Sequence, residues 1–272
     1  MKKKAGKLMA GIFMGLGLMV SQVFAHDLWI NMTDYTPALW QHAKYAPTPR
    51  AKTVVYFGWG HSYPVADFIS DRVWGGLERI EPDGSRIPME VGSEGFRALR
   101  VDMHTPGARV FAAHTKPAFY GPVEGKKDFH QIYYEKYAKA LVSVLPQRTL
   151  PLDGPDSNPF ATPIGQKVEI VPMVNPNRLQ PGDSLEVRVL VDGKPAADYE
   201  VTASNLVAPN ARTEKTRSNA AGMAKLTLEE FYGPWIVTAS RSFPATGEKA
   251  LKCESISYTA TMTFALPFVP EI

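Results

Sequence analysis

Cysteine is almost missing from this sequence, and so are the motifs that mark the common enzyme classes. Cys253 is the single cysteine, so no internal disulfide can form, and we expect it to be a buried small apolar residue. The sequence has no glycine-rich nucleotide motif, P-loop, Gly-x-Ser-x-Gly elbow or tandem repeat. Its acids and serines show no spacing that requires acid–base or nucleophilic catalysis. These absences favour a protein that is not an enzyme and is held together by ordinary hydrophobic cores.

Long apolar runs are scarce as well. The run at residues 8–20 is shorter than the about 20 residues that a bilayer span requires. It follows four lysines and precedes Val23 and Ala25, which stand where signal peptidase prefers small residues. We expect residues 1–25 to be a cleaved secretory signal, with an uncleaved membrane anchor as the alternative. The mature chain then begins at His26, is exported and does not span the membrane.

A charge excess of one sign is lacking once this signal is removed. The signal carries four lysines and no acid, which accounts for the formal net charge of +3 of the full chain. The mature chain is therefore nearly neutral, and nothing in it indicates nucleic acid or an acidic surface as a partner.

Prolines are concentrated in one segment near the middle of the chain. Residues 146–165 carry five prolines and little hydrophobic periodicity, and proline disfavours regular elements. We expect this segment to link an N-terminal domain at residues 26–145 to a C-terminal domain at residues 166–272.

Period-two alternation, with Gly, Pro and Asn at the turns, fills the C-terminal half and predicts an antiparallel sandwich. The runs are 168–174, 184–191, 199–205, 224–229, 234–240 and 255–266, and the turns are 192–195 and 219–222. The N-terminal half is also β-rich, with candidate strands at 53–60, 77–82, 96–103 and 108–114. Residues 128–142 fit a helix by composition and a strand by their tyrosines, and the sequence leaves that choice open. The fold class is all-β.

Several short motifs occur in one order along the mature chain. AHDLWI begins at Ala25, the Gly60-His61 pair follows a strand, and YAKA begins at Tyr137. EIVP begins at Glu169, and Asn175-Pro176, Leu179, Gly182-Asp183 and DGKP from Asp192 follow it. Together they resemble a secreted bacterial family, domain of unknown function 4198, over nearly the whole mature chain.

The resemblance implies two Ig-like β-sandwich domains in the periplasm. Because members are often labelled as components of nickel uptake systems, it also implies the handling of nickel or cobalt beside an inner-membrane metal transporter.

A histidine at a free N-terminus gives this interpretation a chemical basis. Its α-amine and its imidazole Nδ1 can chelate one ion, and in peptides such groups titrate at about 7.7–8.0 and 6.5, so both can lose their protons and act as neutral donors around neutral pH. Nitrogen donors suit nickel and cobalt, with copper and zinc as alternatives. The third mature residue is Leu28, so the amino-terminal motif with histidine in third place is absent.

His61, in a glycine-rich turn at a strand end, is the expected second donor to a metal at His26. His114 and His104 also follow strands and are candidate third donors, or else solvated or capping histidines. Asp27 is either a hydrogen-bond acceptor for an imidazole of this site or an exposed surface acid.

The sequence thus predicts a periplasmic transition-metal-binding protein that serves uptake or delivery of nickel or cobalt. Two alternatives stay open. One is a copper enzyme that acts oxidatively on a polymer with the same donors, and the other is a carbohydrate- or protein-binding module without metal.

Overall fold

Almost every regular element of the chain is a β-strand. The computed structural model describes residues 26–61, 65–147, 159–208, 213–229 and 231–267. The expected signal at 1–25 and most of the expected linker, residues 148–158, lie outside the described residues. Within the described ranges the chain forms only strands and two short 3-10 helices.

The strands of the N-terminal half are β1 (Asp27–Met32), β2 (Trp40–His42), β3 (Ala46–Gly60), β4 (Trp74–Ile80), β5 (Arg86–Met89), β6 (Ala98–Met103), β7 (Gly107–Thr115), β8 (Ala118–Pro122) and β9 (His130–Val144). Those of the C-terminal half are β10 (Val168–Pro172), β11 (Ser184–Val191), β12 (Lys194–Pro195), β13 (Glu200–Asn205), β14 (Glu214–Arg217), β15 (Met223–Thr227), β16 (Gly233–Pro244) and β17 (Cys253–Leu266), with the 3-10 helices η1 (Pro176–Arg178) and η2 (Gly247–Leu251).

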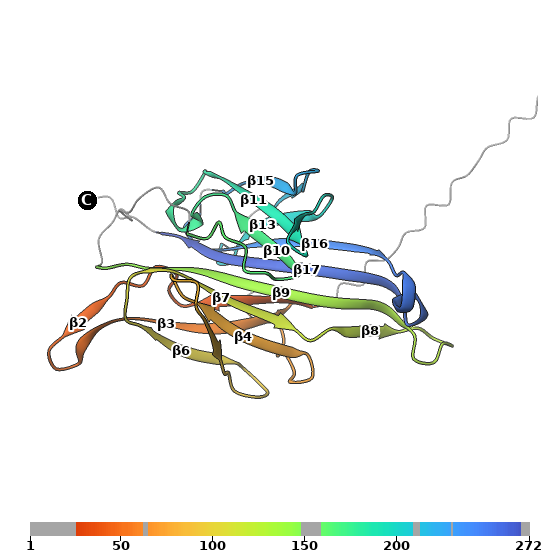
Figure 1. Ribbon diagram of the computed structural model, residues 1–272, viewed down its shortest axis with the longest axis horizontal. Helices are drawn as coiled ribbons and strands as arrows, with labels where there is room; N and C mark the ends of the chain where they lie inside the picture. Colours follow the sequence, from red (N-terminus) through yellow and green to blue (C-terminus); the bar gives the residue numbers. More distant parts are fainter. Residues whose placement is uncertain (1–25, 62–64, 148–158, 209–212, 230, 268–272) are drawn as a thin grey trace, which may run out of the picture.

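One nine-stranded sheet runs through both halves of the chain. Its order is β14-β13-β16-β17-β9-β7-β4-β5, and β8 pairs with the first part of β9. The last strand of the N-terminal half, β9, lies beside the last strand of the chain, β17, across the middle of the molecule (Figure 1). This pair is parallel, whereas the other pairs of named strands are antiparallel.

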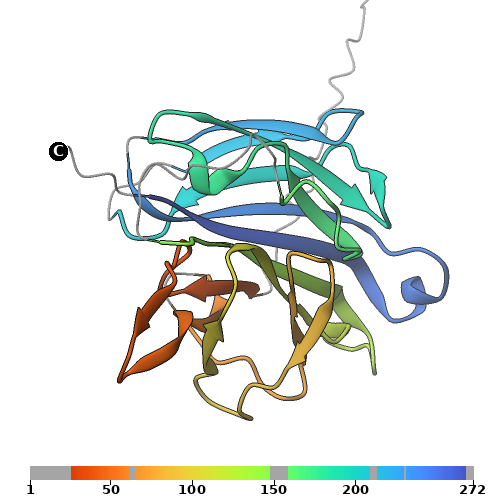
Figure 2. The ribbon, with the colours of Figure 1, turned by 60° about the vertical axis from the view of Figure 1, so that its left-hand side comes forward.

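Two smaller sheets cover opposite faces of the central sheet. The first holds β1, β3, β2 and β6, and the second holds β10, β11, β12 and β15. Along β7, Phe111 and Ala113 pack toward the first sheet, while Val110 and Ala112 pack toward the second. Figure 2 shows the N-terminal half below the central strands and most of the C-terminal half above them. Both faces of the central sheet are therefore buried at its middle.

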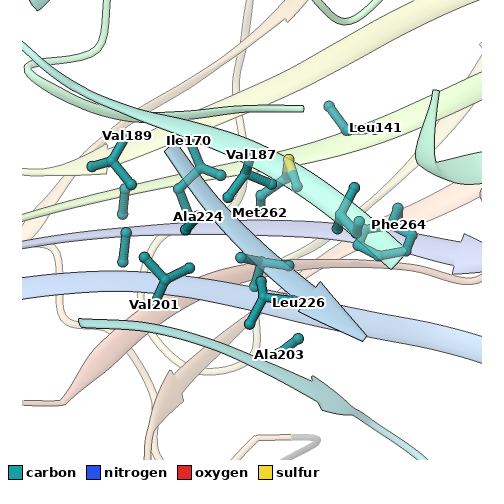
Figure 3. Packing of buried hydrophobic residues seen from close by; sticks show 14 of the residues in the cluster. Leu141, Ile170, Val187, Val189, Val201, Ala203, Ala224, Leu226, Met262 and Phe264 are labelled. Carbon is teal, nitrogen blue, oxygen red and sulfur yellow. The ribbon is translucent and has the colours of Figure 1, made fainter. Parts of the chain in front are cut away.

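The core between the central sheet and β10–β11 is packed from small and branched side chains. Val187 and Val189 of β11 are fully buried and lie close to Ile170, Met262 and Phe264 (Figure 3). Burial of a side chain of this size contributes about 1.5–3 kcal/mol relative to exposure. The alternation that the sequence shows in β11 is thus the inward face of a sandwich.

The turns form where the sequence predicts them. Asp192 and Gly193 both have positive φ and join β11 to β12 in a two-residue hairpin, the backbone that Asp-Gly favours. At the turn of residues 219–222, Gly222 has φ +74°, and a Cβ there would lie 2.5 Å from the carbonyl oxygen of Val189. Only glycine fits that position.

The predicted all-β class with antiparallel sandwiches is confirmed. Residues 130–144 form a strand, which decides the choice that the sequence left open, and Cys253 is buried, as expected. Burial also raises the pKa of the Cys253 thiol above its ordinary value. The boundary between domains at 146–165 stays a prediction, and the two halves share the central sheet. No helix in the described part of the chain is long and apolar enough to cross a membrane.

A buried ion pair joins the two halves of the chain between the central sheet and the sheet of β10. Lys139 of β9 and Glu169 of β10 are each 1% exposed, and Lys139 Nζ lies 2.9 Å from Glu169 Oε1. Glu169 also accepts hydrogen bonds from the backbone N–H groups of Ile164 and Gly165 at 2.8 and 3.0 Å. Burial lowers the pKa of Lys139, and the carboxylate of Glu169 opposes that shift. Each charge depends on the other, because neither side chain has access to water.

We expect Lys139→Met to lower the free energy of unfolding by about 3–5 kcal/mol, because it leaves a buried carboxylate without its cation. The double variant Lys139→Met/Glu169→Gln should recover part of that loss, since no unpaired charge remains. Urea denaturation measures both. Arg217→Met, which breaks an exposed pair with Asp198, is the matched control and should cost less than about 1 kcal/mol. A loss from Lys139→Met no larger than the control would contradict this role.

Candidate functional site

The pairing of β1 with β3 brings His26 beside His61. Asp27, the first residue of β1, lies opposite Gly60, the last residue of β3. His26 and His61 are the next residues outward on the two strands, so antiparallel register makes them neighbours at the rim of the small sheet.

The two imidazoles meet edge to face. Their ring centroids are 4.8 Å apart with an interplanar angle of 82°. The ring centroid of Trp59 lies 5.6 Å from that of His26. The His26 side chain is 37% exposed and His61 is exposed, so both rings are open to solvent. The two histidines favoured by the sequence are therefore adjacent.

Strand β1, which begins directly after His26, is held against the central sheet by polar side chains of that sheet. Lys136 Nζ, buried in β9, lies 2.8 Å from Asp27 Oδ1 and 3.0 Å from Thr259 Oγ1. The hydroxyls of Thr261 and Thr263 donate to the carbonyls of Leu28 and Ile30 at 2.7 and 2.6 Å. Asp27 thus anchors β1 through a buried lysine, a role that the sequence does not predict, and it places His26 at a defined point.

Asp67 completes the surroundings of His26. Its backbone N–H donates to the Trp59 carbonyl at 2.9 Å, so the chain returns to the end of β3 at this residue. Asp67 Oδ2 lies 3.8 Å from His26 Nδ1. A carboxylate therefore stands beside the His26 imidazole.

The other two predicted histidines lie elsewhere. His104 follows Met103, which pairs with Ala51, nine residues from Gly60 along β3. At about 3.3 Å per residue this separates His104 from the His26 end by about 30 Å. Its Nδ1 lies 3.0 Å from the Pro49 carbonyl oxygen. The structure does not bring His104 to the pair.

His114 lies on the opposite face of the central sheet. It stands opposite Tyr137 in the β7–β9 register, and residues that are opposite in a pair share a face. Lys136, the residue before Tyr137, points to the His26 side, so Tyr137 and His114 point away from it. The structure therefore separates His114 from His26 by the thickness of the sheet.

On that face, His114 lines a cavity of about 370 Å³. The cavity is also lined by Glu78, Arg86, Tyr137, Gln166 and Lys167. Its cations are already matched by acids: Arg86 pairs with Glu78, and Lys167 pairs with Glu135.

The carboxylate of Glu135 is held ionised beside this cavity. Burial opposes ionisation of Glu135, but hydrogen bonds from Tyr137, Tyr133 and Lys167 outweigh it and hold its pKa below the ordinary value. This network is internally satisfied.

The side chains alone do not form a closed metal site. In the described ranges, no three His, Cys, Asp or Glu side chains are grouped so that they could hold an ion. Side chains are not the only donors in the predicted site, however, because cleavage before His26 would add its α-amine. Two imidazoles, one amine and a nearby carboxylate are donors that fit nickel, cobalt, copper or zinc.

The sequence missed Asp67 because its approach is a tertiary contact. Its spacing from other acids carries no signal, and it stands eight positions after Trp59. A weak signal lies in Gly60, whose φ of +130° marks the point where the chain leaves β3.

Comparisons with known proteins identify the family of the chain and no more. No curated protein matches the sequence. Among solved structures, the chain is similar to the D0–D1 domain of intimin, with 15% identity, 88% of this chain and 97% of that chain covered, and a TM-score of 0.22. It is also similar to a tetra-tandem repeat in the extending region of a large adhesion protein, with 14% identity, 89% and 50% coverage and a TM-score of 0.24. Similarities this low support no conclusion about fold or function.

The family comparison covers most of the chain. The model of the domain of unknown function DUF4198 matches residues 23–242, a range that contains His26, His61 and Asp67. The chain belongs to the DUF4198 family.

Proposed function

We propose that this protein is a periplasmic binding protein for a transition-metal ion, nickel or cobalt, and that it delivers the ion to an inner-membrane transporter. After cleavage behind Ala25, His26 supplies its α-amine and imidazole, and His61 supplies a second imidazole.

The edge-to-face contact of His26 and His61 is the observation that supports this proposal most directly. The two rings belong to residues 35 positions apart in sequence, and the β1–β3 register brings them together. A chelate that uses the amine and ring of one residue needs little additional ordering, since both donors belong to one residue fixed to β1.

The exposure of the cluster supports a role in transfer. Structural metal sites are closed by four protein ligands, whereas open sites keep a position for exchange. With His26 37% and Asp67 59% exposed, a partner can reach the ion directly. Such a site suits delivery better than permanent storage.

The terminal chelate can be tested by moving the α-amine. We expect mature protein that begins at His26 to bind Ni²⁺ at least roughly tenfold more tightly than a form that retains Ala25, in which the amine of His26 is an amide. Calorimetry measures the affinity. Metal should also raise the thermal midpoint of the mature form, because a ligand of the native state stabilises it. Equal affinities would remove the terminal chelate, and a midpoint unchanged by metal would favour a module without metal.

The second donor can be tested with matched histidine variants. His61→Ala should weaken Ni²⁺ or Co²⁺ binding by roughly 10- to 100-fold, because it removes one of three nitrogen donors. His104→Ala and His114→Ala should bind as the parent does, since both rings lie away from His26. Circular dichroism confirms that each variant is folded. A loss of affinity in His104→Ala equal to that in His61→Ala would contradict the proposed donor set.

A further inference from the structure

Asp67 is held beside His26 and the end of β3 by its own backbone. Its N–H donates to the carbonyl of Trp59, two residues before His61. Trp59 and Asp67 form an isolated antiparallel bridge. The carboxyl group of Asp67 therefore lies at the end of β3. This placement depends on main-chain contacts and not on the flexible end of a long side chain.

The two oxygens of Asp67 have different surroundings. Oδ1 accepts a hydrogen bond from the Phe68 N–H at 2.7 Å, whereas Oδ2 faces His26 Nδ1 at 3.8 Å. That separation is too long for a hydrogen bond. As they stand, the side chains of His26, His61 and Asp67 do not form a group that could hold an ion. Two donors about 2.1 Å from one tetrahedral ion lie about 3.4 Å apart, so Oδ2 and Nδ1 must move closer together to share an ion.

Gly60 makes this approach possible. A Cβ at Gly60 would lie 2.5 Å from the Cβ of Ala66, and the φ of Gly60 is +130°. Any other residue there would push Ala66 and Asp67 away from β3. The glycine that precedes His61 therefore has two consequences: it turns the chain after β3 and leaves room for the carboxylate to return.

We infer that Asp67 supplies an oxygen donor to the ion held by His26 and His61, and that the site takes divalent ions in preference to Cu(I). The inference rests on the proposed function. An anionic oxygen beside neutral nitrogens favours divalent nickel, cobalt, zinc or copper, whereas Cu(I) prefers soft sulfur ligands. Because Oδ1 is bound to the Phe68 amide, Asp67 contributes one oxygen.

The test uses mature protein that begins at His26, with Asp67→Asn, Asp67→Ala and a control. Asp67→Asn keeps an oxygen acceptor for the Phe68 amide but removes the charge. The control, Asp83→Asn, changes another exposed acid that accepts from a turn N–H, that of Ser85, on the β4–β5 hairpin. We expect both Asp67 variants to weaken Ni²⁺ at least roughly tenfold and to weaken Cu(I), measured without oxygen against a chelator, by less than about threefold. Asp83→Asn should change neither.

The spectrum of bound Cu²⁺ separates a ligand from a remote effect. Electron paramagnetic resonance of the mature protein should change when Asp67 is replaced, because one oxygen donor is lost, and stay constant in Asp83→Asn. An Asp67→Asn variant with parental Ni²⁺ affinity and spectrum overturns the inference but leaves the proposed function standing. An equal loss for Cu(I) and Ni²⁺ also overturns it, because Asp67 would then act only on the placement of the histidines. Mature protein that binds no Ni²⁺ overturns the proposed function itself.

Discussion

The parallel pairing of β9 with β17 is the constraint on which both the fold and the candidate site depend. It joins the last strand of each half into one sheet. Both faces of β9 are buried there, and each carries a buried lysine: Lys136 points toward the sheet of β1, and Lys139 points toward the sheet of β10. Each lysine binds a carboxylate from the sheet that covers its face, Asp27 at 2.8 Å and Glu169 at 2.9 Å. The two outer sheets are thus located on the central sheet by charge as well as by packing.

Ion pairs made by a buried lysine are better suited to fixing a register than to adding stability. The desolvation of two charges offsets much of their attraction, but a shift of one residue would leave both without a partner. The position of β1 is fixed further by Thr261 and Thr263 of β17. Their hydroxyls donate hydrogen bonds to the carbonyls of Leu28 and Ile30. The strand that carries His26 is therefore set against the central sheet at several successive residues. These contacts give His26, the residue directly before β1, a defined position beside His61.

The sequence carries enough information for the strands and turns, but only part of the site. Alternating side chains locate the strands, and Asp192 with Gly193 fixes a hairpin, because these are local effects. Residues 130–144 are ambiguous because both faces of β9 are buried, so its polar residues follow ion pairs and not exposure. The pairing of β9 with β17 joins segments more than 100 residues apart, and no local pattern encodes it.

The candidate site is predicted only in part. The chemistry of histidine predicts that His26 and His61 act together. His104 and His114 also lie at strand ends, but the sequence does not show at which end of the sheet, or on which of its faces, such a histidine lies. Asp67 depends on a chain return that only the folded structure reveals.

The proposed site combines a rigid base with open donors, and this combination has a consequence for its chemistry. Asp27, directly after His26, is held by a buried lysine, so the backbone below the donors does not move with the ion. The donors themselves lie at the rim, where His26 and Asp67 are open to solvent. A rigid base limits the entropy lost on binding, which favours capture, while exposure leaves coordination positions for an incoming ligand, which favours release. The proposed function, in which the protein hands its ion to a transporter, needs both properties: β1 is anchored through Asp27, and His26 and His61 lie at the exposed rim.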